Sequence, residues 1–161
     1  RSGRLRDCIR LWKKGLGAAM TDIDMKQVLI SSDPSLLDLD AIVQFLRESY
    51  WANERSDQKI KKSLEGSTCF GAYYNNRQIG FARVVTDGAT VYWLCDVYVD
   101  EAYRGLGVGK KLIETITTHE DYRNVFGILS TRDAHGLYEQ YGFVRDHGKT
   151  LTRMPDFLRK D

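Results

Sequence analysis

The chain has 161 residues, of which 42% are hydrophobic and 29% are charged, and this composition is typical of one globular domain with its own core. No apolar run approaches the roughly 20 residues that cross a bilayer. The net charge of +2 combines +5 in residues 1–20 with −3 in residues 21–161, and a mildly acidic domain does not indicate a nucleic-acid-binding surface. Cys8, Cys69 and Cys95 are odd in number and widely spaced, which fits neither a disulfide framework nor a zinc site. We therefore expect a cytoplasmic protein with reduced thiols and with no metal, nucleic-acid or membrane partner.

The first twenty residues differ in composition from the rest of the chain. They hold six basic side chains and one acidic side chain, with apolar residues at helical spacing between the charges. A basic amphipathic helix can bind a membrane surface or a protein partner. We interpret residues 1–20 instead as an expression leader or a flexible N-terminal extension, and we expect residues 21–161 to form a single domain.

The first elements of this domain alternate between the periodicities of strands and helices. Residues 25–30 indicate a strand. Asp33 followed by Pro34 predicts a helix start, because Asp caps helices and Pro suits the first helical position. Apolar residues over 36–46 continue this helix, and a polar helix is expected over 57–65, before a glycine that can end it.

Three strands are expected next, over residues 68–74, 78–85 and 91–99. Asn75 and Asn76 separate the first two, and Asn tolerates the positive φ angles of a tight hairpin turn. Thr86, Asp87 and Gly88 indicate another turn before the third strand.

The second half of the domain begins with a glycine-rich loop. A helix with apolar residues at 108, 112, 113 and 116 follows this loop, and then come the elements of the C-terminal region. These are a strand over 125–130, a short helix over 134–140, and a closing hairpin over 143–146 and 149–154. The order β-α-α-β-β-β-α-β-α-β-β predicts an α/β (α+β) fold.

The loop itself, RGLGVG at residues 104–109, is compatible with phosphate binding, and its spacing separates three known patterns. A Walker A loop would need a glycine where Arg104 stands and a hydroxyl where Lys111 stands. A dinucleotide fingerprint would need a glycine at Lys110 or Leu112, and neither is present. The pattern [Gln/Arg]-x-x-Gly-x-[Gly/Ala] is matched at every defined position. In that pattern, glycines allow backbone N–H groups to converge on a pyrophosphate at a helix N-terminus.

With this loop, the segment VYVDEAYRGLGVGKKLIETI at residues 97–116 resembles motif A of the GNAT superfamily of acetyl-CoA-dependent N-acetyltransferases. About thirty residues further on, AHGLYEQYGFV at residues 134–144 resembles motif B of the same family. The resemblance covers roughly residues 25–154. It implies the GNAT fold, with a mixed, mostly antiparallel sheet of about seven strands, about four flanking helices and central strands that splay apart.

The resemblance also implies a site for acetyl-CoA as cosubstrate, with no metal. The pyrophosphate would lie on the glycine loop, and the pantetheine arm would pair with the strand before it, where an N–H near Val97 could polarise the thioester carbonyl. The cofactor-binding residues expected on this basis are Val97, Tyr98, Val99, Arg104, Gly105, Leu106, Gly107, Val108, Gly109 and Lys110.

Two side chains are candidates for moving protons in the transfer. Tyr138 matches the tyrosine that many GNAT enzymes use as a general acid for the departing thiolate, whereas Tyr141 is expected to pack. Asp96 is expected to share a strand face with Tyr92, Leu94 and Tyr98. We consider three roles for it: a general base, a ligand for the substrate ammonium, or a structural hydrogen-bond acceptor.

The acceptor side is expected in the segment ESYWANERS at residues 48–56. Tyr50 and Trp51 present aromatic faces that attract cations, and Arg55 can pair with a carboxylate. The alternative is that both aromatic residues simply cover the sheet. We expect an enzyme that acetylates the primary amine of a small molecule. A protein or peptide acetyltransferase and an inactive CoA-binding module are the alternatives, and a homodimer is possible.

Overall fold

A computed structural model describes residues 23–153 of the chain, so the expectation for residues 1–20 lies outside the described residues. Five strands form one mixed sheet in the order β1-β2-β3-β4-β5, antiparallel throughout except for the parallel pair β4 and β5. The strands are β1 (Leu29–Ser31), β2 (Thr68–Tyr74), β3 (Arg77–Thr86), β4 (Val91–Val99) and β5 (Phe126–Leu129). The α-helices are α2 (Leu39–Glu48), α3 (Asp57–Glu65), α4 (Val108–Thr118) and α5 (His135–Glu139).

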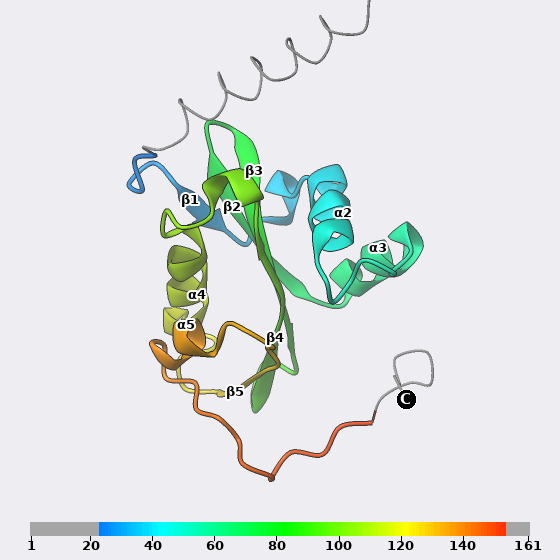
Figure 1. The fold of residues 1–161 in the computed structure, drawn as a ribbon, viewed down its shortest axis with the longest axis vertical. Coiled ribbons are helices and arrows are strands. Elements are labelled where there is room, and N and C mark those ends of the chain that lie inside the picture. The colour runs from blue at the N-terminus through cyan, green and yellow to red at the C-terminus, as the bar shows by residue number, and fades with distance from the viewer. Residues whose placement is uncertain (1–22, 154–161) are drawn as a thin grey trace, which may run out of the picture.

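The helices cover the two faces of the sheet separately. In Figure 1 the sheet is seen nearly edge-on, with α2 and α3 on one side and α4 and α5 on the other. Ile42, Leu46 and Ile60 pack with Phe81 on the first face, and Leu112 belongs to a second core cluster on the opposite face. This arrangement confirms the predicted mixed α/β class. No helix within residues 23–153 is long and apolar enough to cross a bilayer.

Local sequence signals explain most element boundaries. The strands predicted over 68–74 and 91–99 and the helix over 57–65 are confirmed. Asn75 and Asn76 join β2 to β3 with φ angles of 49° and 59°, the left-handed values that the hairpin requires. Ser56 caps α3 by accepting a hydrogen bond from the N–H of Lys59.

The start of the domain differs from the prediction. The strand predicted over 25–30 is only Leu29–Ser31. Asp33 and Pro34 start a single 3-10 turn, Pro34–Leu36, and do not start the long helix. The backbone then becomes extended at Leu37, and Asp38 caps α2 through the N–H of Ala41. Asp38 is thus the second of two candidate caps, and it lies closer to the buried residues of α2, which begin at Ile42. The helix begins directly after this second cap.

The C-terminal prediction was wrong in one respect. The closing hairpin over 143–146 and 149–154 does not form within the described residues: residues 143–153 hold no strand. The sheet consequently has five strands among residues 23–153, in place of the expected seven or so, and β5 is its last strand.

The strand β4 is longer than its neighbour β5, so its pairing with β5 stops partway along β4. The parallel pairing of β4 with β5 runs from Val91 to Leu94 and then stops, although β4 continues to Val99. The last five residues of β4, which are residues 95–99, therefore pair only with β3. This open segment leads directly toward the glycine loop and α4.

A β-bulge in β4 lies in the same segment. Arg83 pairs with Cys95 and Phe81 pairs with Tyr98, so two residues of β4, Asp96 and Val97, face one residue of β3. Asp96 adopts a φ angle of 53°, which short polar side chains tolerate better than most. The bulge reverses the alternation of side chains along the strand.

That reversal corrects the expected neighbours of Asp96. Tyr92 and Leu94 belong to the core cluster beneath α4, whereas Tyr98 belongs to the cluster beneath α2. Asp96 shares a face with Tyr98, as expected, but not with Tyr92 and Leu94. One additional residue in the strand moves the carboxylate to the side of α2 and α3.

Candidate active site

The glycine loop runs from the end of β4 to the start of α4. Gly105 and Gly107 have φ angles of 77° and 95°, in the region that strongly favours glycine. Gly107 is the N-cap of α4 and supplies no side-chain cap. The first backbone hydrogen bond of the helix is that from the N–H of Lys111 to the carbonyl of Gly107, at 3.0 Å.

The loop therefore leaves a row of backbone donors free. No backbone carbonyl within residues 23–153 accepts a hydrogen bond from the N–H groups of residues 105–110. No described atom lies within 4 Å of where a Cβ on Gly105 would stand, so the surface of the loop is open there. Free N–H groups at the N-terminus of an eleven-residue helix attract anions, and the loop fits a pyrophosphate group.

The basic residues around the loop have different contacts. Arg104 donates from Nε to the carbonyl of Val99 at 3.0 Å, and its guanidinium carbon lies 5.0 Å from the centre of the Tyr98 ring. Lys111 binds the carbonyl oxygens of Met25 and Val28 and thereby fastens the chain before β1 to α4. Lys110 is exposed. The charges of Arg104 and Lys110 thus lie beside the loop, where an anion could bind, whereas Lys111 holds the segment before β1 against α4.

The Tyr98 phenol connects this region to α2. Its hydroxyl donates to Oε2 of Glu48 at 2.7 Å, and Gln44 donates to the other oxygen of that carboxylate. Burial, and then the hydrogen bond to Glu48, raises the pKa of Tyr98 to about 12. The Tyr98 hydrogen bond, followed by that of Gln44, lowers the pKa of Glu48, so the pair is a neutral phenol and a carboxylate at neutral pH.

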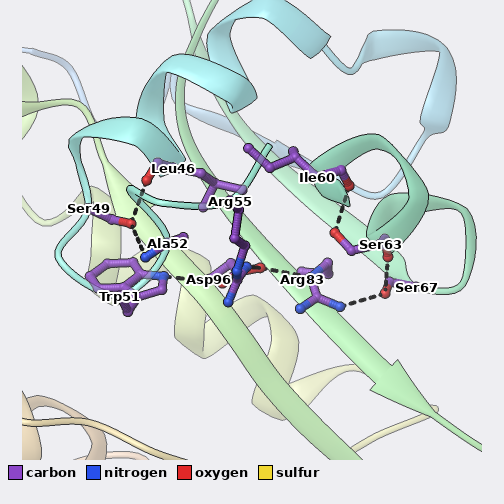
Figure 2. A network of polar contacts seen from close by, with 10 residues as sticks. All are labelled: Leu46, Ser49, Trp51, Ala52, Arg55, Ile60, Ser63, Ser67, Arg83 and Asp96. Carbon is purple, nitrogen blue, oxygen red and sulfur yellow. Dashed lines mark hydrogen bonds and ion pairs between the residues drawn. The ribbon is translucent and has the colours of Figure 1, made fainter. Parts of the chain in front are cut away.

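Asp96 is the centre of a polar network on the same face of the sheet. Its carboxylate accepts hydrogen bonds from Nε1 of Trp51 at 3.1 Å, from Nη1 of Arg55 at 3.0 Å and from Nε of Arg83 at 2.8 Å. Figure 2 shows these three side chains reaching Asp96, the first two from the loop between α2 and α3 and the third from β3. The Asp96 side chain is only 2% exposed. Both carboxylate oxygens are engaged with guanidinium groups.

Serine hydroxyls support this network at its two ends. Arg83 donates from Nη1 to the hydroxyl of Ser67 at 3.0 Å. Ser49 accepts from the N–H of Ala52 and donates to the carbonyl of Leu46, which fixes the turn that carries Trp51 (Figure 2). The loop holding the predicted acceptor residues is therefore ordered by internal hydrogen bonds and by its contact with β4.

Tyr138 lies on the opposite side of the opening, on α5. It packs against Phe143, with ring centres 6.0 Å apart. Burial raises the pKa of its phenol to about 12, and the nearby Tyr50 and Asp133 contribute to the same shift. The guanidinium carbon of Arg132 lies 3.8 Å from the centre of the Tyr50 ring. The loop at residues 48–56, which we call the acceptor loop, thus meets the segment before α5, beyond the point where β4 and β5 stop pairing.

The structure brings most of the predicted site residues into this region. Tyr50, Trp51 and Arg55 lie together with Asp96, and Val97 to Val99 form the open end of β4. Sequence reasoning missed Arg83 and Arg132. An arginine within the run IGFARVV at residues 79–85, which is otherwise small or apolar, was the available signal for Arg83, whereas nothing in the local pattern distinguishes Arg132.

Comparisons with known proteins support the resemblance found in the sequence. A profile of the Acetyltransferase (GNAT) domain matches residues 65–145, about half of the chain. A crystal structure from Xanthomonas campestris, described as belonging to the GNAT family, is 36% identical with a TM-score of 0.76. The match covers 81% of this chain and 95% of that one.

Two curated relatives are more distant. A protein of Gibberella zeae, whose name assigns it to the acetyltransferases, is 30% identical over 108 residues, which are 55% of this chain and 61% of that protein. An uncharacterized N-acetyltransferase of Pyropia yezoensis is 24% identical over 131 residues, covering 77% of this chain and 74% of the relative. The profile match includes the glycine loop, Asp96 and Tyr138, but the acceptor loop at residues 48–56 precedes it.

Proposed function

The chain belongs to the GNAT acetyltransferase family, and on this premise we propose that it is an N-acetyltransferase that moves an acetyl group from acetyl-CoA to the primary amine of a small molecule. The observation that carries the proposal is the row of free N–H groups over residues 105–110, beside the open end of β4. The free N–H groups of the loop suit a pyrophosphate, and the unpaired edge of β4 has the backbone groups that the extended pantetheine arm of acetyl-CoA needs.

The glycine loop and β4 would hold the cosubstrate together. Residues 104–110 provide backbone donors and the charges of Arg104 and Lys110, and Val97, Tyr98 and Val99 provide the strand edge. When bound, acetyl-CoA supplies an activated acetyl thioester: a C–N bond forms, the C–S bond breaks, the amine loses a proton and the thiolate gains one. Arg104 contacts Tyr98 and Val99, so its side chain already lies between the glycine loop and the end of β4.

Tyr138 is the proposed proton donor. Its phenol, with a pKa of about 12, keeps its proton across the neutral range and can donate to negative charge that develops on sulfur. Packing against Phe143 on the short helix α5 fixes the direction of the ring. A protonated phenol held in one orientation supports the general-acid role that the sequence predicts for Tyr138.

The contacts of Asp96 favour one of its three expected roles. Two guanidinium groups and an indole N–H already bind its carboxylate, so both oxygens have hydrogen-bond donors and neither is left open to a substrate amine. We infer that Asp96 is a positioning residue that orients Trp51 and Arg55 toward the acceptor. Deprotonation of the amine would then proceed through water.

Binding and turnover test the function in sequence. We expect acetyl-CoA to raise the melting temperature of the full chain, and we expect release of free thiol with at least one member of a panel of small primary amines. Arg104→Ala should weaken acetyl-CoA binding, whereas Arg123→Ala, at an exposed arginine distant from the loop, should not.

Three outcomes separate the alternatives. Absence of any acetyl-CoA-induced shift would contradict the whole proposal. A shift without turnover on amines or peptides would favour a CoA-binding module. Turnover with lysine peptides but not with small amines would favour a protein acetyltransferase.

A further inference from the structure

Arg55 contacts Asp96 through only one of its three nitrogens. Its Nη1 lies 3.0 Å from each oxygen of the carboxylate, and Nε and Nη2 have no hydrogen-bond partner among residues 23–153. Arg83 is used differently, since its Nε binds Asp96 and its Nη1 binds Ser67. The Nε–Nη2 edge of an arginine is the side that binds a carboxylate with two parallel hydrogen bonds. In Arg55 this edge is free.

The free edge is also accessible. The side chain of Arg55 is 30% exposed, whereas those of Arg83 and Asp96 are 12% and 2% exposed. Of the two arginines that bind Asp96, Arg55 is therefore the one that can reach a small molecule while remaining bound to the protein. Figure 2 shows it descending from the acceptor loop to Asp96, between Trp51 and Arg83.

The charge of the network favours an anion at this edge. Two guanidinium groups share one carboxylate, so the ion pairs found within residues 23–153 leave one partly buried positive charge of this network unmatched. Glu48, the nearby acid of α2, is bound to Tyr98 and Gln44. A carboxylate from outside the chain would supply the missing negative charge.

The position of the edge relates it to the proposed reaction. Arg55 binds Asp96, and the next residue along β4 is Val97, whose N–H we assign to the thioester. Consecutive Cα atoms joined by a trans peptide bond are separated by about 3.8 Å. The ring of Tyr98 lies 6.4 Å from that of Trp51 and adds an apolar wall. A ligand with its carboxylate on Arg55 and its amine at the thioester must therefore be compact.

From these contacts we propose that the acceptor is a free amino acid or a compact amino-acid-like molecule, whose carboxylate binds the Nε–Nη2 edge of Arg55 while its amine is acetylated. This inference rests on the proposed function. It adds the chemical class of the acceptor and gives Arg55 the role of determining specificity.

Matched acceptors test this inference directly. Free-thiol release is measured for each free amino acid, its carboxamide and its decarboxylated amine, with acetyl-CoA saturating. We expect kcat/KM for the free acid to exceed that for the carboxamide by about tenfold or more, since a charge-assisted pair with two parallel hydrogen bonds is stronger than the contact a neutral amide makes. The difference should appear mainly in KM.

Variants then assign the preference to one side chain. Arg55→Gln should bring the ratio of kcat/KM for the acid to that for the carboxamide close to one. Arg55→Lys keeps the charge but not the edge with two donors, so it should retain only part of the preference for the acid. Arg47→Gln removes an exposed arginine that pairs with Asp57 and should keep the ratio of the unaltered protein. Because Arg55 also supports Asp96, the acetyl-CoA thermal shift of each variant serves to verify that the cosubstrate site is intact.

The results distinguish failure of this inference from failure of the function. If carboxamides or decarboxylated amines react as well as the acids, the inference is overturned and the acetyltransferase activity stands. A preference that persists in Arg55→Gln but disappears in Arg132→Gln would assign the carboxylate to the other arginine and overturn the inference as well. If no amine is acetylated, both proposals fail.

Discussion

The indole nitrogen of Trp51 donates a hydrogen bond to Asp96, with 3.1 Å between Nε1 and Oδ1. This bond joins the loop between α2 and α3 to the bulge of β4, and Arg55 and Arg83 bind the same carboxylate. Trp51 and Arg55, which were predicted to bind the acceptor, therefore belong to the same hydrogen-bond network as Asp96, the candidate base. A change at Asp96 should affect the position of the loop and the stability of the domain together.

Asp96→Asn is the first test of that coupling. Asn also tolerates the φ angle of 53° at this position, so the change removes charge without adding backbone strain. Two guanidinium groups would then lose their shared anion. We expect the free energy of unfolding to fall by about 2–3 kcal/mol, less than for a fully buried pair because Arg55 retains some hydration. Chemical denaturation measures this loss.

The pH–rate profile of the same variant separates a positioning role from a base. A positioning role predicts a raised KM for the acceptor with the acidic limb of the profile unchanged in shape. Loss of the acidic limb, with stability unaffected, would instead identify Asp96 as the base.

The sequence predicted the parts of the fold that depend on short-range signals. The β2–β3 hairpin follows from Asn75 and Asn76, and α3 follows from Ser56 and the glycine at position 66. The start of α2 was wrong because two Asp residues, Asp33 and Asp38, compete as caps, and only the packed structure selects between them. Competition between similar local signals is decided by tertiary contacts.

The sequence predicts the members of the candidate site but not the contacts between them. The glycine loop and Tyr138 belong to motifs with fixed spacing, so the sequence alone indicates them. The ion pairs of Asp96 depend on a bulge that inserts one residue opposite β3, and no sequence pattern in β4 marks it. That single residue moved the carboxylate to the face of Arg83, which a strict alternation of side chains could not predict.

Gly107→Ala tests the geometry of the phosphate loop. A Cβ at a φ angle of 95° is strained, and we expect a loss of about 1–2 kcal/mol in the free energy of unfolding together with weaker acetyl-CoA binding. Gly66→Ala is the matched control, because Gly66 has a φ angle of −98° and open space around it. Calorimetric titration with acetyl-CoA measures the affinity. Equal affinity in both variants would contradict the role of the loop.

The pair of Glu48 and Tyr98 predicts a dependence of stability on pH. The folded state lowers the pKa of Glu48 below its ordinary value of 4.5, so the pair stabilises the folded protein fully above that value. This contribution is lost as the pH falls through the lowered pKa. Glu48→Gln should therefore melt at a lower temperature than the unaltered protein at pH 7. At pH 3 the difference between the two melting temperatures should be smaller. Glu120→Gln, at an exposed glutamate, should show no such convergence, and a constant difference for Glu48→Gln would refute the linkage.

Tyr138→Phe tests the proton donor. The variant keeps the ring that packs against Phe143 and loses only the hydroxyl, so acetyl-CoA affinity should change little. We expect kcat to fall by about tenfold or more, in the range of a general-acid contribution. With a phenol pKa of about 12, the unaltered enzyme should show no loss of kcat attributable to Tyr138 between pH 7 and about pH 10. Tyr141→Phe, three residues further along the chain, provides the control and should retain its rate. If both variants turn over at the rate of the unaltered protein, Tyr138 packs in the core without donating a proton, and the thiolate must be protonated by solvent.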